Sequence, residues 1–248
     1  MILIFYAFAR EAAVFKRRIE RRTALGIGGL RGFRGRLGAT EVVGVFTGLG
    51  IDRAAETARR AMESLAPVDL AIATGLAGAL TEKLQTGDLV LADRLILDRS
   101  PVPNGETIAA NPTDLASFES ALAAGRIRFT IGPILTAIRV LKDGRSKRDA
   151  GARTGALAVD MESAGIAAEA RRRRIRFACL RAVLDTVDEE IVGAELAGAD
   201  GEVRPLAAAA FVMRNPSAVP GLARMMRSVN RATAALADAL AVLIQPGV

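Results

Sequence analysis

Short apolar runs alternating with longer amphipathic segments are the feature that most restricts the fold of this chain. The runs predict strands at Ile2 to Phe8, Glu41 to Phe46, Val68 to Thr74, Leu89 to Ala92, Ile127 to Ile131 and Ile175 to Val183. Helices are predicted at Asp52 to Leu65, Met161 to Arg174 and Ser217 to Ile244. This alternation is typical of βαβ units in an α/β fold. Without a repeat or linker, residues 1–248 are expected to form a single domain.

Two loop-like segments interrupt the pattern. Gly26 to Gly38 is rich in Gly and Arg, and we interpret it as turns between strands, with a nucleic-acid-binding tail as the alternative. Asp98 to Pro112 contains three prolines and a glycine, and we interpret it as a loop or lid.

The composition excludes several kinds of catalytic site. The chain has no His, no Trp, one Tyr and one Cys, Cys179. Ser-His-Asp triads, Cys-His pairs, His-ligated zinc and intrachain disulfides are therefore excluded. Acid-base chemistry falls to carboxylates, Lys, Tyr6 or the thiol. We expect neither a metal nor an organic cofactor.

The charge balance suggests two alternative partners. With 34 basic residues the net charge is +7, which suits nucleic acid or an anionic membrane. Aromatic residues total only 4%, so stacking platforms for nucleic acid are scarce and we expect no nucleic-acid partner. The run Met1 to Ala9 has no preceding cationic segment, and Ala232 to Ile244 is too short for a membrane span. We expect a cytoplasmic protein, with peripheral membrane contact as an alternative.

Two glycine turns follow successive predicted strands. One contains Gly48 and Gly50, and the other contains Gly75, Ala77 and Gly78. Such turns let backbone N–H groups approach phosphate or sugar oxygens at the strand ends of an α/β sheet. The dinucleotide-binding fingerprint does not fit, because the third residue after Gly50 is arginine. Plain tight turns are the alternative.

Carboxylates lie near the predicted strand ends. Asp160 and Glu162 flank Met161 in the sequence where a helix begins, a pattern that favours binding of sugar hydroxyls. Helix capping is an alternative explanation for Asp160. Asp185 follows a buried strand, where burial and nearby acids favour a protonated carboxyl, although it is also a candidate helix cap. Glu11 follows the first strand and alone is an ordinary first-turn glutamate. Together these acids suit cleavage of a glycosidic bond.

The order of these motifs resembles the purine nucleoside phosphorylase and nucleosidase superfamily, which includes methylthioadenosine/S-adenosylhomocysteine nucleosidase. The resemblance spans nearly the whole chain. Its most specific part is Val159 to Ser163 followed by Arg181 to Asp185, similar to the family's Met-Glu element and Arg-Ala-x-x-Asp strand. The glycine turns and Gly87 to Val90 match further family motifs. The resemblance implies a three-layer α/β sandwich with a mixed, mostly parallel sheet, and a homo-oligomer.

The resemblance also implies roles for individual residues. Glu162, with Met161 and Asp160, is expected to bind the ribose, and Gly75, Ala77 and Gly78 to line the nucleoside site. Asp185 is expected to protonate N7 of the purine. Glu11 is expected to orient the attacking water. Gly48, Gly50 and Arg10 are expected at the water position, or at a phosphate pocket in a phosphorylase.

The sequence departs from the nucleosidases in two places. The position of Asp160 is often Glu in that family. The segment from Asp98 to Thr113 lacks the aromatic and histidine residues that close over the 5′ group there. The chain is similar to the hopanoid-associated branch, which implies a bulky, lipid-linked substrate, adenosylhopane, losing adenine. The alternatives are a methylthioadenosine/S-adenosylhomocysteine nucleosidase, a phosphate-dependent purine nucleoside phosphorylase, a non-catalytic nucleoside-binding protein, and a basic membrane- or nucleic-acid-associated protein.

Overall fold

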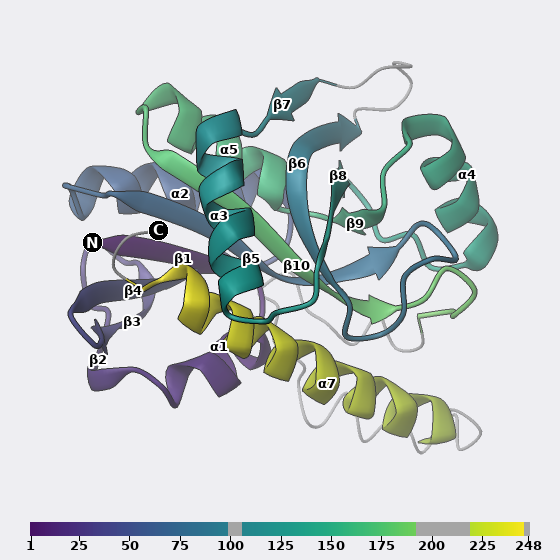
Figure 1. The fold of residues 1–248 in the computed structure, drawn as a ribbon, viewed down its shortest axis with the longest axis horizontal. Helices are drawn as coiled ribbons and strands as arrows, with labels where there is room; N and C mark the ends of the chain where they lie inside the picture. The colour runs from purple at the N-terminus through teal and green to yellow at the C-terminus, as the bar shows by residue number, and fades with distance from the viewer. Residues whose placement is uncertain (99–105, 192–218, 246–248) are drawn as a thin grey trace.

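The computed structural model describes residues 1–98, 106–191 and 219–245, and within them the strands form one sheet (Figure 1). The strands are β1 (Ile2–Tyr6), β2 (Glu20–Ala24), β3 (Arg31–Leu37), β4 (Thr40–Phe46), β5 (Leu70–Ala79), β6 (Leu89–Asp98), β7 (Thr107–Ala109), β8 (Thr130–Ala137), β9 (Ala158–Asp160) and β10 (Arg176–Asp185). The helices are α1 (Ala9–Lys16), α2 (Ile51–Ser64), α3 (Pro112–Ala124), α4 (Gly144–Thr154), α5 (Ser163–Arg172) and α7 (Val219–Leu243).

The centre of the sheet is parallel. Strands β4, β1, β5 and β10 lie side by side in the same direction, so their carboxyl ends meet at one edge. Strands β3 and β2 extend the sheet beyond β4 as antiparallel neighbours. The edge where the parallel strands end is where ligands bind in open α/β sheets.

The other half of the sheet closes on itself. The first residues of β5 pair with β1, whereas Gly78 and Ala79 near its end pair with β9. Strand β9 continues through β8 and β6 to β10, which returns to β5. This closure brings the ends of β5, β9 and β10 together, because all three belong to one small barrel-like ring.

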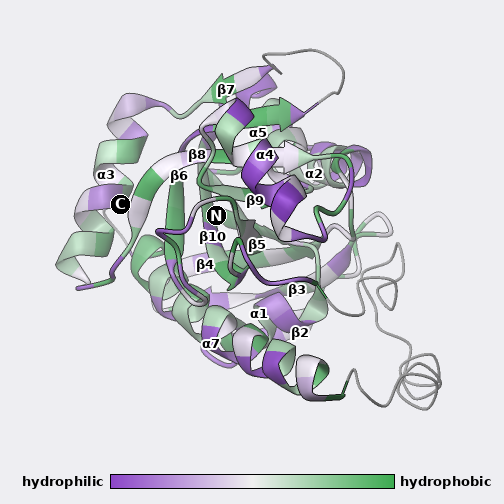
Figure 2. Cartoon of the chain, turned by 90° about the vertical axis from the view of Figure 1, so that its right-hand side faces the viewer, coloured by the Kyte–Doolittle hydropathy of each residue, from purple (hydrophilic) through white to green (hydrophobic). Residues whose placement is uncertain are grey.

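Helices cover both faces of the sheet and make the two outer layers (Figures 1 and 2). Helices α2 and α5 pack on one face through small residues, and a Cβ at Gly165 would overlap the Ile51 carbonyl of α2. Helices α1, α3 and α7 cover the other face with larger side chains, including Phe15, Phe118 and Leu240. The predicted three-layer α/β sandwich with a mixed sheet is therefore confirmed.

Several elements differ from the sequence-based expectations. The glycine- and arginine-rich segment is not only turns, because residues 31–37 form β3, whose Gly32 approaches the Gly44 carbonyl of β4 too closely for a Cβ. Helix α4 and strand β2 were not predicted, since both are largely polar. The expected loop at 98–112 contains β7, and its residues 99–105 lie outside the described part.

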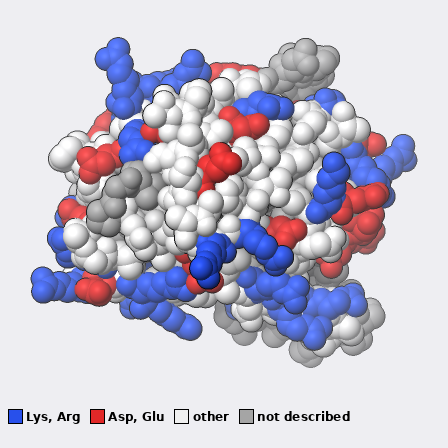
Figure 3. Space-filling view, viewed as in Figure 1, with Lys and Arg blue, Asp and Glu red and all other residues white. Residues whose placement is uncertain are grey.

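Charged side chains are spread over the face of the molecule that Figure 3 shows. Figure 3 shows Lys and Arg along the lower side of the view, where Figure 1 places α1 and α7, and both signs elsewhere. Among the helices described here, none combines the length and apolar character needed to cross a bilayer.

Candidate active site

Glu11 connects the end of β1 to the end of β5. Its Oε2 accepts hydrogen bonds from the backbone N–H groups of Ala7 (2.8 Å) and Phe8 (2.9 Å), so the residue does cap α1. Its Oε1 accepts from the N–H of Leu76 on β5 at 2.8 Å. Burial raises the pKa of the Glu11 carboxyl, and the Arg181 guanidinium opposes the rise. Glu11 therefore belongs to the strand-end site as well as to its own helix.

Arg181 is a buried cation at the centre of this group of acids. It lies opposite Gly75 in the β10–β5 pairing, and its side chain is 1% exposed. Gly75 has φ +146°, and a Cβ there would overlap both the Arg181 Nη1 and the Glu11 Oε1. Glycine at this position thus leaves space that the guanidinium and the carboxyl both approach beside the β5 backbone, and Nη1 donates to the Thr74 carbonyl (3.2 Å).

Asp160 holds Arg181 in place. The Asp160 Oδ2 lies 2.5 Å from Arg181 Nη2, and Oδ1 accepts from Thr136 Oγ1 at 2.8 Å. Ser163 donates to the same carboxylate from its N–H and its hydroxyl, and the hydroxyl accepts from Arg181 at 2.9 Å. The Asp160 side chain has no exposed surface through which it would touch a ligand.

Glu162 faces the first glycine turn. It is the N-cap residue of α5 but makes no capping hydrogen bond with its side chain. Instead, its Oε1 accepts from the Gly50 N–H at 3.1 Å, and its Oε2 lies 3.7 Å from Arg181 Nη2. Burial, opposed by Arg181 and reinforced by Asp160 and Glu11, raises the Glu162 pKa to about 8. A carboxyl of this kind both donates to and accepts from a vicinal diol.

Asp185 ends β10 beside Gly78 of β5 and is 8% exposed. Its Oδ2 forms an ion pair with the ammonium group of Lys147 on α4. Burial raises the pKa of the Asp185 carboxyl, while Lys147 opposes the rise. The side chain is therefore turned inward at the strand end, and it has a cationic partner that was not predicted.

The remaining predicted residues divide into two groups. Gly48 and Gly50 lie in the loop after β4, as predicted. The second predicted turn is wrong, because β5 continues through Gly75, Ala77 and Gly78, which pair with β10 and β9. Half-buried Met161 lies between Asp160 and Glu162 in the chain. Arg10 is not brought to this site: it is exposed, and its guanidinium donates to the Met226 Sδ on α7 at 3.0 Å.

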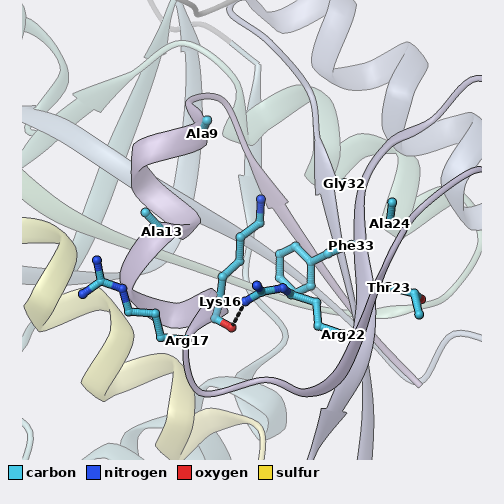
Figure 4. A pocket seen from close by; sticks show the side chains of 9 residues that line it. All are labelled: Ala9, Ala13, Lys16, Arg17, Arg22, Thr23, Ala24, Gly32 and Phe33. Carbon is cyan, nitrogen blue, oxygen red and sulfur yellow. Dashed lines mark hydrogen bonds between the residues drawn. The ribbon is translucent and has the colours of Figure 1, made fainter.

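A separate cavity of about 500 Å³ opens between α1 and strands β2 and β3 (Figure 4). None of the predicted site residues lines it. Lys16 lies there with its Nζ 5.2 Å from the centre of the Phe33 ring, and Arg22 donates to the Lys16 carbonyl at 2.6 Å. The lining residues are Ala9, Ala13, Lys16, Arg17, Arg22, Thr23, Ala24, Gly32 and Phe33.

Two residues of the candidate site were given no role in the sequence analysis: Lys147, and Arg181, which was named only as the start of the Arg-Ala-x-x-Asp motif. Arg181 had a usable signal, because it is a charge within an otherwise apolar buried strand. Lys147 had none, because it lies on a polar helix whose other basic residues are exposed or partly exposed.

Comparisons with known proteins show which family the chain belongs to. The family model of the phosphorylase superfamily matches residues 2–213. The 5′-methylthioadenosine/S-adenosylhomocysteine nucleosidase of Aeromonas salmonicida is 28% identical, with 76% of this chain and 87% of that protein covered.

Solved structures share the fold at low identity. The same-named nucleosidase of Neisseria meningitidis, in complex with methylthio-immucillin-A, has a TM-score of 0.77 at 20% identity, covering 98% of this chain and 97% of that one. Futalosine hydrolase of Helicobacter pylori has a TM-score of 0.72 at 19% identity, covering 96% of each chain.

Proposed function

Because the chain belongs to the phosphorylase superfamily, we propose that it is an enzyme that hydrolyses the N-glycosidic bond of a 5′-substituted adenosine and releases adenine. The observation that carries the proposal is that Glu11 and Arg181 both approach the space left by the missing Cβ of Gly75, with Glu162 beside the same guanidinium. This arrangement supplies a base, a fixed positive charge and a sugar-binding carboxyl at one strand-end edge.

The roles follow from the chemistry of each group. Glu162 binds the ribose hydroxyls, Met161 packs against the sugar, and Gly75, Ala77 and Gly78 line the nucleoside site. Asp160 acts by holding Arg181, since its own oxygens already accept from Thr136, Ser163 and Arg181.

The reaction proceeds by departure of the base and attack of water. The C1′–N9 bond breaks with its electron pair going to the purine, and Asp185 gives a proton to N7, so that the base leaves neutral. The oxygen of the attacking water bonds to C1′, and Glu11 takes a proton from that water. The oxocarbenium-like sugar is stabilised by the negative charge that the Glu11 carboxylate has before it takes the proton.

Water is favoured over phosphate as the attacking group. A buried glutamate at the attacking position repels a phosphate dianion, and Arg10, the residue considered for phosphate, is turned towards α7. Phosphorolysis is the alternative, in which the Gly48 and Gly50 turn binds the anion.

The 5′ substituent is proposed to be large and apolar, with adenosylhopane as the specific candidate. The support is the sequence of residues 98–113, which has no aromatic or histidine residue to close over a small 5′ group. A lipid-linked substrate would also give the basic residues over α1 and α7 a role at an anionic membrane surface. 5′-Methylthioadenosine and S-adenosylhomocysteine, named for the Aeromonas relative, are the alternative substrates.

One assay separates these options. The purified protein is incubated with methylthioadenosine, adenosylhomocysteine and adenosylhopane, each with and without phosphate, and adenine, free ribose and ribose 1-phosphate products are quantified. We expect adenine and free ribose product without phosphate, fastest for the lipid-linked substrate. Strict phosphate dependence would contradict hydrolysis, and binding without any release of adenine would favour a nucleoside-binding protein.

A further inference from the structure

Lys147 is a charged side chain without exposed surface, on the face of α4 that packs against the end of β10. Its ammonium group donates to the Asp185 Oδ2, to the Thr186 carbonyl at 2.9 Å and to the Glu189 carbonyl at 2.6 Å. An ammonium group has three N–H donors, so these three acceptors satisfy it completely. The position is therefore built for a cation.

The three acceptors lie on one short piece of chain. Asp185 ends β10, and the Thr186 N–H donates to the Glu189 carboxylate at 2.9 Å, which folds the next residues into a turn. The same turn approaches the start of α4, where a Cβ at Gly144 would contact the Val187 carbonyl. Lys147 therefore joins α4 to the carboxyl at the strand end and to the turn that follows it.

The charges around Asp185 come from two sides. Lys147 faces it from α4, and Glu189 acts on it from the turn; the neighbouring strand β5 contributes the backbone of Gly78. The adjacent residue of α4, Arg148, pairs instead with Asp188 at the surface, where these side chains are 49% and 71% exposed. Burying a charged lysine costs free energy of folding, and an apolar side chain would fill the same space without that cost.

We propose that Lys147 is a positioning residue for the acid of the reaction, fixing the Asp185 carboxyl through Oδ2 and setting the pH range in which that carboxyl carries a proton. This inference rests on the proposed function. With Oδ2 held by the ammonium, Oδ1, which has no hydrogen-bond partner among the described residues, is the oxygen left for the leaving base. Its proton goes to N7 while the C1′–N9 electron pair goes to the purine.

The test uses a substrate that needs no proton. In an N7-methylated nucleoside the purine is already cationic, so it leaves as a neutral base without an acid. Wild type, Lys147→Met, Lys147→Gln and Arg148→Met are compared on the adenosine that the wild type cleaves fastest and on its N7-methyl derivative, over pH 5 to 10. Arg148→Met is the matched control, because it removes a cation from the next position of the same helix.

We expect Lys147→Met to lower kcat on the parent nucleoside at pH 7 by at least about tenfold and on the N7-methyl derivative by less than about threefold. The alkaline limb of kcat/KM on the parent should move to higher pH, because the carboxyl loses its cationic neighbour. Arg148→Met should match the wild type on both substrates. Lys147→Gln keeps N–H donors for the carbonyls, so it gives the same answer if Lys147→Met does not fold.

Two results would overturn the proposal. One is an equal loss on both substrates with the alkaline limb unmoved, which is the behaviour of a residue that only supports the fold. The other is unchanged turnover in both Lys147 variants. Absence of base release by the wild type would instead refute the proposed function, and this inference with it.

Discussion

The guanidinium of Arg181 lies 2.5 Å from the Asp160 carboxylate, and neither side chain has more than 1% of its surface exposed. The same guanidinium lies 3.7 Å from Glu162 and is close enough to Glu11 to affect its charge, so one fixed cation lies among three acidic side chains, two from residues 160–162 and one from α1. The site therefore depends on this ion pair for its geometry.

Removal of Asp160 should destabilise the fold. Asp160→Ala leaves Arg181 buried without its main partner, so the free energy of unfolding should fall by about 3–5 kcal/mol. Urea denaturation measures this. Asp238→Ala breaks an ion pair with Arg18 in which both side chains are partly exposed, and should cost under about 1 kcal/mol. Equal costs for the two variants would show that the buried pair has no special role.

Gly75→Ala should disable the site. The added Cβ would push against both Glu11 and Arg181, and φ +146° is strained for any side chain. We expect kcat to fall at least about tenfold and the melting temperature to drop. Gly26→Ala is the matched control, since a Cβ there has nothing within 4 Å. A fully active Gly75→Ala enzyme would place the reaction elsewhere.

The residues of the site differ in how much of their position the sequence predicts. Parallel strand ends place Gly75, Glu11 and Asp185 at one edge, and that much follows from the βαβ pattern. The dual role of Glu11 does not follow, because its contact with Leu76 spans 65 residues. Likewise, the Lys147 ammonium group is enclosed by the turn after β10. The local sequence of α4 does not predict that contact, because the turn lies about 40 residues further along the chain.

Stability should fall as the pH rises through neutrality. The Glu162 pKa is near 4.5 in the unfolded chain and about 8 in the folded protein, so between these values the folded state binds the extra proton. This contribution is complete below pH 4.5 and is lost as the pH approaches 8, with a slope of up to about 1.4 kcal/mol per pH unit. Glu162→Gln should flatten the slope in urea titrations from pH 5 to 8. An identical slope in that variant would contradict the assignment.

Glu11→Gln should separate catalysis from binding. The amide fills the same space but takes no proton from water, so we expect kcat to fall at least about 100-fold with KM nearly unchanged. Steady-state adenine release measures both constants. If only KM rises, Glu11 contributes to substrate binding rather than to activation of water.

The most direct test of the whole account is adenine release by Asp185→Asn. The amide keeps the shape of the side chain at the end of β10 but has no acidic proton for N7. We expect the variant to bind a 5′-substituted adenosine with wild-type affinity in calorimetry, and to release adenine at least about 100-fold more slowly. Wild-type turnover by Asp185→Asn would contradict the proposed mechanism.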